Sequence, residues 1–231
     1  LSGIDSAKMA RRSRAYRPVR QSYFDRTARG EVRWCSTLFP TDALAQEADM
    51  SLAEYQEFVY AAGELNATDP VAEWQAEGRR QKELVDWLAG RDQVVLQGAD
   101  IDLRLSIRGR QFEVSDGKFN FPDGEIFTGP VEDSVSGWVR FRYPAIWGGR
   151  EVENVELWFE EGQVVREQAT KGQDLLTQML STDAGARRLG EWGIGTNYDI
   201  LKFSKNMLFD EKLGGTVHFA LGASYPETGG K

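Results

Sequence analysis

The spacing of apolar residues changes near residue 92, and no other feature of the sequence constrains the fold as strongly. Up to this point Ala, Arg, Glu, Gln and Leu dominate, and apolar residues recur at helical intervals. Beyond it, apolar and polar residues alternate with the period of two that a half-buried strand requires. We therefore predict an α+β fold, with a mainly helical part over residues 1–92 and a β-rich, mostly antiparallel part over residues 93–231.

Short signals predict where the helices of the first part begin and end. Ser51 opens a capping box ahead of a helix over residues 52–62. Asp69 is placed to cap a helix that begins with a proline and is closed by Gly90. The remaining predicted elements are a long basic helix over residues 6–29, kinked or broken at Pro18, a short helix after Pro40, and a short strand over residues 32–38 that buries Cys35.

Six segments of the second part have the alternation and the β-branched content of strands. They cover residues 94–97, 101–107, 111–114, 137–143, 152–159 and 164–168. Turns at residues 108–110 and 160–162 fit antiparallel hairpins. Two helices, over residues 174–180 and 184–189, are expected to interrupt the strands.

Charge and hydropathy exclude several classes of partner. The net charge is -8 and the pI is about 4.9, so we expect no nucleic-acid partner. No run approaches the roughly 18 apolar residues of a membrane span, and the first residues lack the apolar core of a signal peptide. We therefore expect a cytoplasmic protein that does not bind membranes.

The chain has a single cysteine, Cys35, and a single histidine, His218. This excludes a disulfide framework, a cysteine-rich zinc module and any site that needs two imidazoles from these residues. A metal site in this chain must therefore be built mainly from carboxylates.

Three segments of the β-rich part differ from ordinary sheet. Residues 115–130 contain two Asp-Gly turns and deliver Glu125 onto a strand. Glu191 follows a glycine and precedes apolar residues, and His218 lies inside an apolar strand. Two glutamates and a histidine, each fixed on a strand, form a ligand set that a divalent metal accepts. Such a site could be hydrolytic.

Each of these residues also has a structural explanation. A glutamate after a turn is commonly a solvated strand end, and a lone histidine in a strand is commonly a satisfied core residue. A second enzyme class is also open, because Glu125 and Glu191 could act as the two carboxylates of a glycosidase without any metal.

At these three segments the sequence closely resembles the thermophilic-type metallo-aminopeptidases, the family of aminopeptidase T and aminopeptidase S. The matching stretches are SDGKFNFPDGEIFTGPVEDSVSGWVRF (115–141), GEWGIGTNYDI (190–200), KNMLFDEKLGGTVHFALGASYPETGGK (205–231) and, more weakly, PTDALAQEADMSLAEYQEFV (40–59). They are long and occur in the order that the family has. The resemblance covers essentially the whole chain.

The resemblance implies a cytoplasmic, homodimeric exopeptidase that removes N-terminal residues from peptides with a free N-terminus. It implies two divalent metal ions, which could be zinc, cobalt, manganese or magnesium, to activate water and polarise the scissile carbonyl. By motif, Glu125, Glu191 and His218 are metal ligands and Tyr225 is a catalytic residue that could donate a hydrogen bond to the oxyanion. The general base is not identified, although Glu132 and Glu227 lie in the matching stretches.

The resemblance also implies that the chain is a fragment of a longer enzyme. Residues 1–92 correspond to the helical remnant of an N-terminal α/β domain, and residues 93–231 to a catalytic metal-binding domain. The family's remaining ligands, in an HWD motif, are expected beyond Lys231, so we expect the fragment itself to be inactive. The main alternative is a non-catalytic binding or dimerisation module that keeps the aminopeptidase fold.

Overall fold

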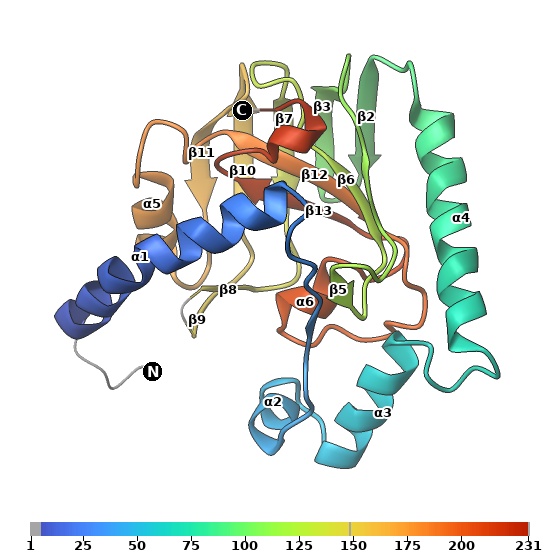
Figure 1. Ribbon diagram of the computed structural model, residues 1–231. Helices are drawn as coiled ribbons and strands as arrows, with labels where there is room; N and C mark the ends of the chain where they lie inside the picture. The colour runs from blue at the N-terminus through green and yellow to red at the C-terminus, as the bar shows by residue number, and fades with distance from the viewer. Residues whose placement is uncertain (1–5, 148, 231) are drawn as a thin grey trace. The chain divides into compact units, whose positions relative to one another are not determined.

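The computed structural model describes residues 6–147 and 149–230, which form parts of two compact units, residues 1–36 and 37–231 (Figure 1). The ends of the predicted ranges 1–92 and 93–231, and residue 148, lie outside the described residues. In the first unit, α1 (Ser6–Ala28) is continuous through Pro18, so the helix is not broken there, and the kink stays a prediction.

The strand predicted over residues 32–38 is short. Only β1 (Ser36–Thr37) has strand geometry. Cys35 is exposed, so the prediction that its side chain is buried is wrong. No helix among the described residues is both long enough and apolar enough to cross a membrane.

The second unit begins with three helices whose caps were readable from the sequence. They are α2 (Asp42–Glu47), α3 (Leu52–Ala62) and α4 (Pro70–Leu88). The Ser51 side chain accepts from the backbone N–H of Glu54, whose carboxylate accepts from the N–H of Ser51, which confirms the capping box. Asp69 caps α4 by accepting from the N–H of Ala72.

The two main sheets of this unit are antiparallel. The larger has the order β11-β10-β7-β3-β2 and the smaller β13-β12-β6-β4. The larger sheet consists of β11 (Gln163–Gln168), β10 (Glu156–Glu160), β7 (Ser136–Arg140), β3 (Ile101–Ser106) and β2 (Gln93–Gly98). The smaller consists of β13 (Val217–Leu221), β12 (Leu189–Gly195), β6 (Glu125–Thr128) and β4 (Glu113–Ser115). The α+β class is therefore confirmed.

Several short elements complete the unit. They are β5 (Asn120–Phe121), β8 (Ala145–Trp147), β9 (Arg150–Val152), α5 (Gln173–Leu180), α6 (Met207–Asp210) and the 3-10 turn η1 (Pro226–Thr228). The single strand predicted over residues 152–159 is split into β9 and β10, with Asn154 between them at a φ of 51°, a left-handed conformation that interrupts a strand.

Apolar side chains of both sheets share one core. Leu103 and Leu157 of the larger sheet pack in the same cluster as Ile126 and Trp192 of the smaller sheet. Leu176 of α5 and the inward face of α4 belong to the same cluster, so these helices cover the sheets. A second cluster, built around Tyr55, Ile200 and Phe209, joins α2 and α3 to α6.

The helix predicted over residues 184–189 is wrong. Residues 184–187 form a turn, and Leu189 already begins β12. The Asp183 carboxylate accepts from the N–H groups of Gly185 and Ala186. This local side-chain bonding offers the backbone an alternative to a helix.

The change in apolar period coincides with a change in secondary structure, because α4 ends at Leu88 and β2 starts at Gln93. The helices from α2 to α4 lie in the same compact unit as the sheets. The division of the protein into domains at residue 92 stays a prediction.

Asn197 joins three segments beside the start of β6. Its buried side-chain amide donates to the carbonyl oxygens of Ala62 and Asp123, each at 2.9 Å, and its Oδ1 accepts from the N–H of Asp199. Gly124 has a φ of 122°, and a Cβ there would lie 2.5 Å from the Cβ of Asn197. The turn before Glu125 is therefore held against the end of α3.

We expect Asn197→Ala to lower the free energy of unfolding by about 2–4 kcal/mol, because two buried carbonyls lose their donor. Chemical denaturation would measure the loss. Asn66→Ala is the matched control, since Asn66 is exposed, and it should change stability by less than about 0.5 kcal/mol. Equal stability of the two variants would contradict the role given to Asn197.

Candidate metal centre

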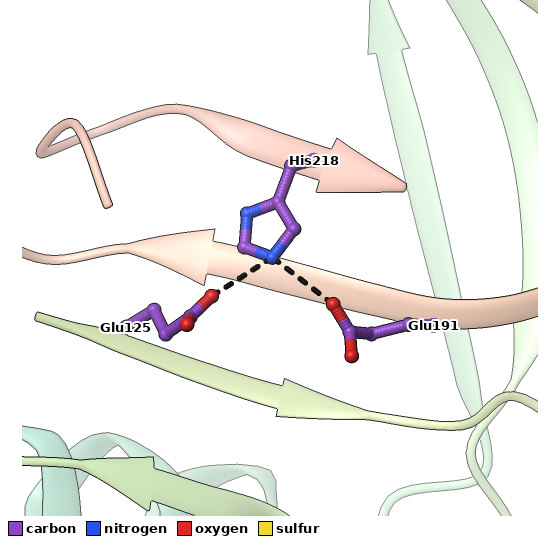
Figure 2. A group of neighbouring side chains, drawn as sticks. All are labelled: Glu125, Glu191 and His218. Atoms are coloured by element: carbon purple, nitrogen blue, oxygen red, sulfur yellow. Dashed lines mark ion pairs between the residues drawn. The ribbon is translucent and has the colours of Figure 1, made fainter. Parts of the chain in front are cut away.

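Three hydrogen-bonded strands of the smaller sheet carry the predicted site residues. Glu125 begins β6, Glu191 lies in the central strand β12, and His218 lies in β13 (Figure 2). Gly195 of β12 is opposite Glu125, and Gly193 is opposite His218. Opposite residues share a face of a sheet, as do alternate residues of one strand, so all three side chains project from one face.

The glycines of β12 make room for this arrangement. A Cβ at Gly193 would lie 2.1 Å from His218 Nε2, so the imidazole occupies the space above this position. A Cβ at Gly195 would lie 2.1 Å from the carbonyl oxygen of Leu213. The Gly-Ile-Gly segment of β12 is therefore required by its neighbours, and a larger residue at either position would displace them.

A β-bulge at the start of β12 sets which side chains face the site. Leu189 pairs with Leu221, but Glu191 already pairs with Ala220, so β12 has one additional residue here. The additional residue changes the alternation of side chains along the strand. As a result Leu189 and Trp192, three residues apart, are both buried in the core, while Glu191 faces the site.

The side-chain donor atoms converge closely. His218 Nε2 lies 2.9 Å from Glu125 Oε2 and 3.4 Å from Glu191 Oε1, and one donor atom of each residue lies within 4.8 Å of the other two. Glu125 Oε2 and both ring nitrogens of His218 are buried and make no hydrogen bond. Nε2 and Oε2 are thus adjacent without hydrogen-bond alignment, and once the imidazole has lost its proton both atoms could bind a shared cation.

The three side chains also perturb one another electrostatically. Burial acts to lower the pKa of His218, but Glu125 and Glu191 outweigh it and raise this pKa to about 9 in the metal-free protein. Burial acts to raise the pKa of Glu125, but His218 and Lys212 outweigh it and hold this pKa below its usual value. The imidazole of His218 and the carboxylate of Glu125 therefore form a charged pair when no cation is bound.

Two further ionisable residues, Glu211 and Lys212, lie beside the site. The Lys212 Nζ is 3.1 Å from Glu125 Oε1, 2.5 Å from Glu211 Oε1 and 3.9 Å from Asp123 Oδ1. Burial raises the pKa of Glu211, and it raises the pKa of Asp123 to about 7. Burial acts to lower the pKa of Lys212, but Glu125 and Glu211 more than offset it.

Sequence reasoning did not single out Glu211 or Lys212, although both lie in the quoted stretch 205–231. A usable signal was present, since an Asp-Glu-Lys run lies one residue before a Gly-Gly turn and the histidine strand. Their distance from Glu125 in the sequence hid the contact, which arises only when β13 pairs with β12 and β12 with β6.

The other residues considered for the chemistry lie outside the ligand group. Tyr225 packs its ring on Phe127 at 5.5 Å and is largely exposed. Burial, followed by Glu191, raises the pKa of Tyr225 above 10. Glu132 pairs with the partly buried Arg110 at 2.7 Å, which is a structural contact, and Glu227 is exposed in η1.

A sequence model of the family described as thermophilic metalloprotease (M29) matches residues 1–231, the whole chain. The chain belongs to this family. Membership in a metalloprotease family agrees with the donor set, because two carboxylates and an imidazole suit divalent metal ions.

Proteins similar to this chain support its assignment to the thermophilic metalloprotease family. The chain is 28% identical over 98% of its length to aminopeptidase 2 of Geobacillus stearothermophilus and 30% identical over 98% to aminopeptidase T of Thermus thermophilus. The solved structure of wild-type AmpT from Thermus thermophilus superposes with a TM-score of 0.70 and 26% identity over 95% of the chain. The chain spans about 60% of the length of these relatives.

We expect the imidazole of His218 to titrate near pH 9 in the metal-free protein. His218 is the only histidine of the chain, so one imidazole resonance in an NMR titration reports it. Glu191→Gln removes one of the two carboxylates and should lower the midpoint. A wild-type midpoint near the unperturbed value of about 6.5 would contradict the electrostatic description.

The same shift fixes the sign of a stability effect. The folded pKa of His218 is above the unfolded value of about 6.5. Its contribution to the stability of the metal-free protein is therefore complete below that pH and is lost as the pH rises through about 9.

We expect Gly193→Ala to displace the imidazole, because the added methyl group would overlap His218 Nε2. The free energy of unfolding should fall by about 1–3 kcal/mol, as is usual for overpacking, and the NMR midpoint of His218 should fall. Gly98→Ala is the control, since a Cβ there would meet Ile101 Cγ2 at an ordinary 3.6 Å. An unchanged midpoint in Gly193→Ala would refute the close approach.

Proposed function

We propose that the full-length protein is a metal-dependent aminopeptidase that releases N-terminal residues from peptides, with Glu125, Glu191 and His218 as metal ligands. One observation carries this proposal: three buried or half-buried donor groups converge on one face, and neither Glu125 Oε2 nor the ring nitrogens of His218 have a hydrogen-bond partner. The names of the relatives, all aminopeptidases, supply the reaction class.

Each residue has a separate task in this proposal. A bound divalent cation would lower the pKa of water and polarise the scissile carbonyl. Glu125 and His218 would hold the cation from the two strands that flank β12, and Glu191 would hold it from β12 itself. Tyr225 keeps its phenolic proton at neutral pH, because its pKa is raised, and could donate it in a hydrogen bond to the oxyanion.

The number and identity of the ions stay predictions. Among residues 6–147 and 149–230, Glu125, Glu191 and His218 are the only group of three or more donors close enough to share an ion. A second ion would need donors in addition to this group. Zinc, cobalt, manganese and magnesium can all bind at a carboxylate-rich site. The homodimer and the cytoplasmic location also stay predictions.

The glycosidase alternative is less compatible with the geometry. The imidazole of His218 lies between the two carboxylates, within 3.4 Å of each. It fills the space in which a glycosidase must hold the sugar. A non-catalytic module would not require three convergent donor groups that include a carboxylate oxygen and an imidazole without hydrogen-bond partners, and nothing in the site favours it.

Glu125→Gln and Glu191→Gln should each lower kcat/KM of the full-length protein for aminoacyl p-nitroanilides by at least about 100-fold, because each removes a ligand charge. Chelator should abolish the wild-type activity, and added metal should restore it. Glu160→Gln, at an exposed strand end, is the control and should retain activity. Full activity in both ligand variants, or activity that resists chelator, would overturn the proposal.

A further inference from the structure

Lys212 is a fully buried lysine beside the candidate ligands. None of its side-chain surface is exposed. Its backbone is fixed on both sides, since its N–H donates to the carbonyl of Phe209 and its carbonyl accepts from the N–H of Asn197. The ammonium group therefore has a defined position, and it cannot contact a substrate.

Burial of an ammonium group is costly unless carboxylates compensate it. Lys212 has three such partners: Glu211, Glu125 and Asp123. These carboxyl groups come from two distant parts of the sequence, the start of β6 with the turn before it and the segment that precedes β13. The lysine therefore ties together the two segments that carry Glu125 and His218.

Lys212 also gives the two carboxylate oxygens of Glu125 different surroundings. Nζ lies 3.1 Å from Oε1, whereas Oε2 lies 2.9 Å from His218 Nε2 and makes no hydrogen bond. One oxygen is thus held by the ammonium group, and the other is left for a cation. Rotation of the carboxylate would break the contact with Lys212.

We propose that Lys212 is a positioning residue that fixes Glu125 so that only Oε2 is presented to the metal ion. This inference rests on the proposed function. If Lys212 acted only through its charge, it would weaken metal binding, because a positive charge beside the site repels a cation. A positioning role would strengthen metal binding. Removal of the charge therefore tightens metal binding if repulsion dominates and weakens it if positioning dominates.

Calorimetric titration of the full-length protein with Co²⁺ distinguishes these cases. We expect Lys212→Met to weaken Co²⁺ binding by about 10–100-fold, the usual effect of losing a group that orients a ligand. The visible absorption spectrum of bound Co²⁺ should also change, because the coordination of Glu125 changes. Lys171→Met is the control, since Lys171 pairs with Glu151 and Glu153 and with none of the ligands, and its affinity and spectrum should match the wild type.

Lys212→Arg keeps the charge and decides the question if Lys212→Met does not fold. We expect an intermediate affinity and an altered spectrum, because the guanidinium group places its donors differently. The inference would be overturned if Lys212→Arg had the Co²⁺ affinity and spectrum of the wild type. It would also be overturned if folded Lys212→Met bound Co²⁺ as tightly as the wild type or more tightly. Either result would leave the proposed function standing. Failure of the wild-type protein to bind Co²⁺ would overturn the proposed function and the inference with it.

Discussion

The close pairing of β12 with β6 and β13 is the constraint on which the site depends. Glu125 and His218 come from the two strands that flank β12, and only glycine at the facing positions of β12 lets the imidazole and the neighbouring chain approach. The donor atoms are thus carried by hydrogen-bonded strands, which hold side chains more precisely than loops do. The loop that ends at Glu125 is held in turn by the buried amide of Asn197.

The charges around this face are unbalanced. Four carboxyl groups lie here, those of Asp123, Glu125, Glu191 and Glu211, but only two groups that can carry a positive charge, those of Lys212 and His218. In the metal-free protein the imbalance is reduced by protonation, since the pKa values of Asp123, Glu211 and His218 are all raised. A divalent cation would provide the same compensation without protons, so metal binding is expected to release them.

Local signals in the sequence predicted more of the fold than of the site. The helix caps at Ser51 and Asp69 depend on residues within one turn, so they were readable directly. The prediction of a helix over residues 184–189 was wrong because the carboxylate of Asp183 accepts hydrogen bonds from backbone N–H groups of this segment.

For the site, motifs identified Glu125, Glu191 and His218, and the structure brings them together. Their role as ligands stays a prediction. Which side chains surround them depends on strand register, a long-range property that periodicity does not contain. The buried ion pair between Lys212 and Glu125 is the clearest example, since the two residues are far apart in the sequence and meet only in the folded sheet.

The bulge at the start of β12 also limits how this part of the chain can change in length. It provides the one-residue offset that lets Leu189 enter the core while Glu191 faces the site. An insertion or deletion of one residue between Leu189 and Gly195 would exchange the two faces and would place a carboxylate in the core. Length variation among proteins with this site should therefore be confined to the connecting loops, and this strand should keep a fixed number of residues.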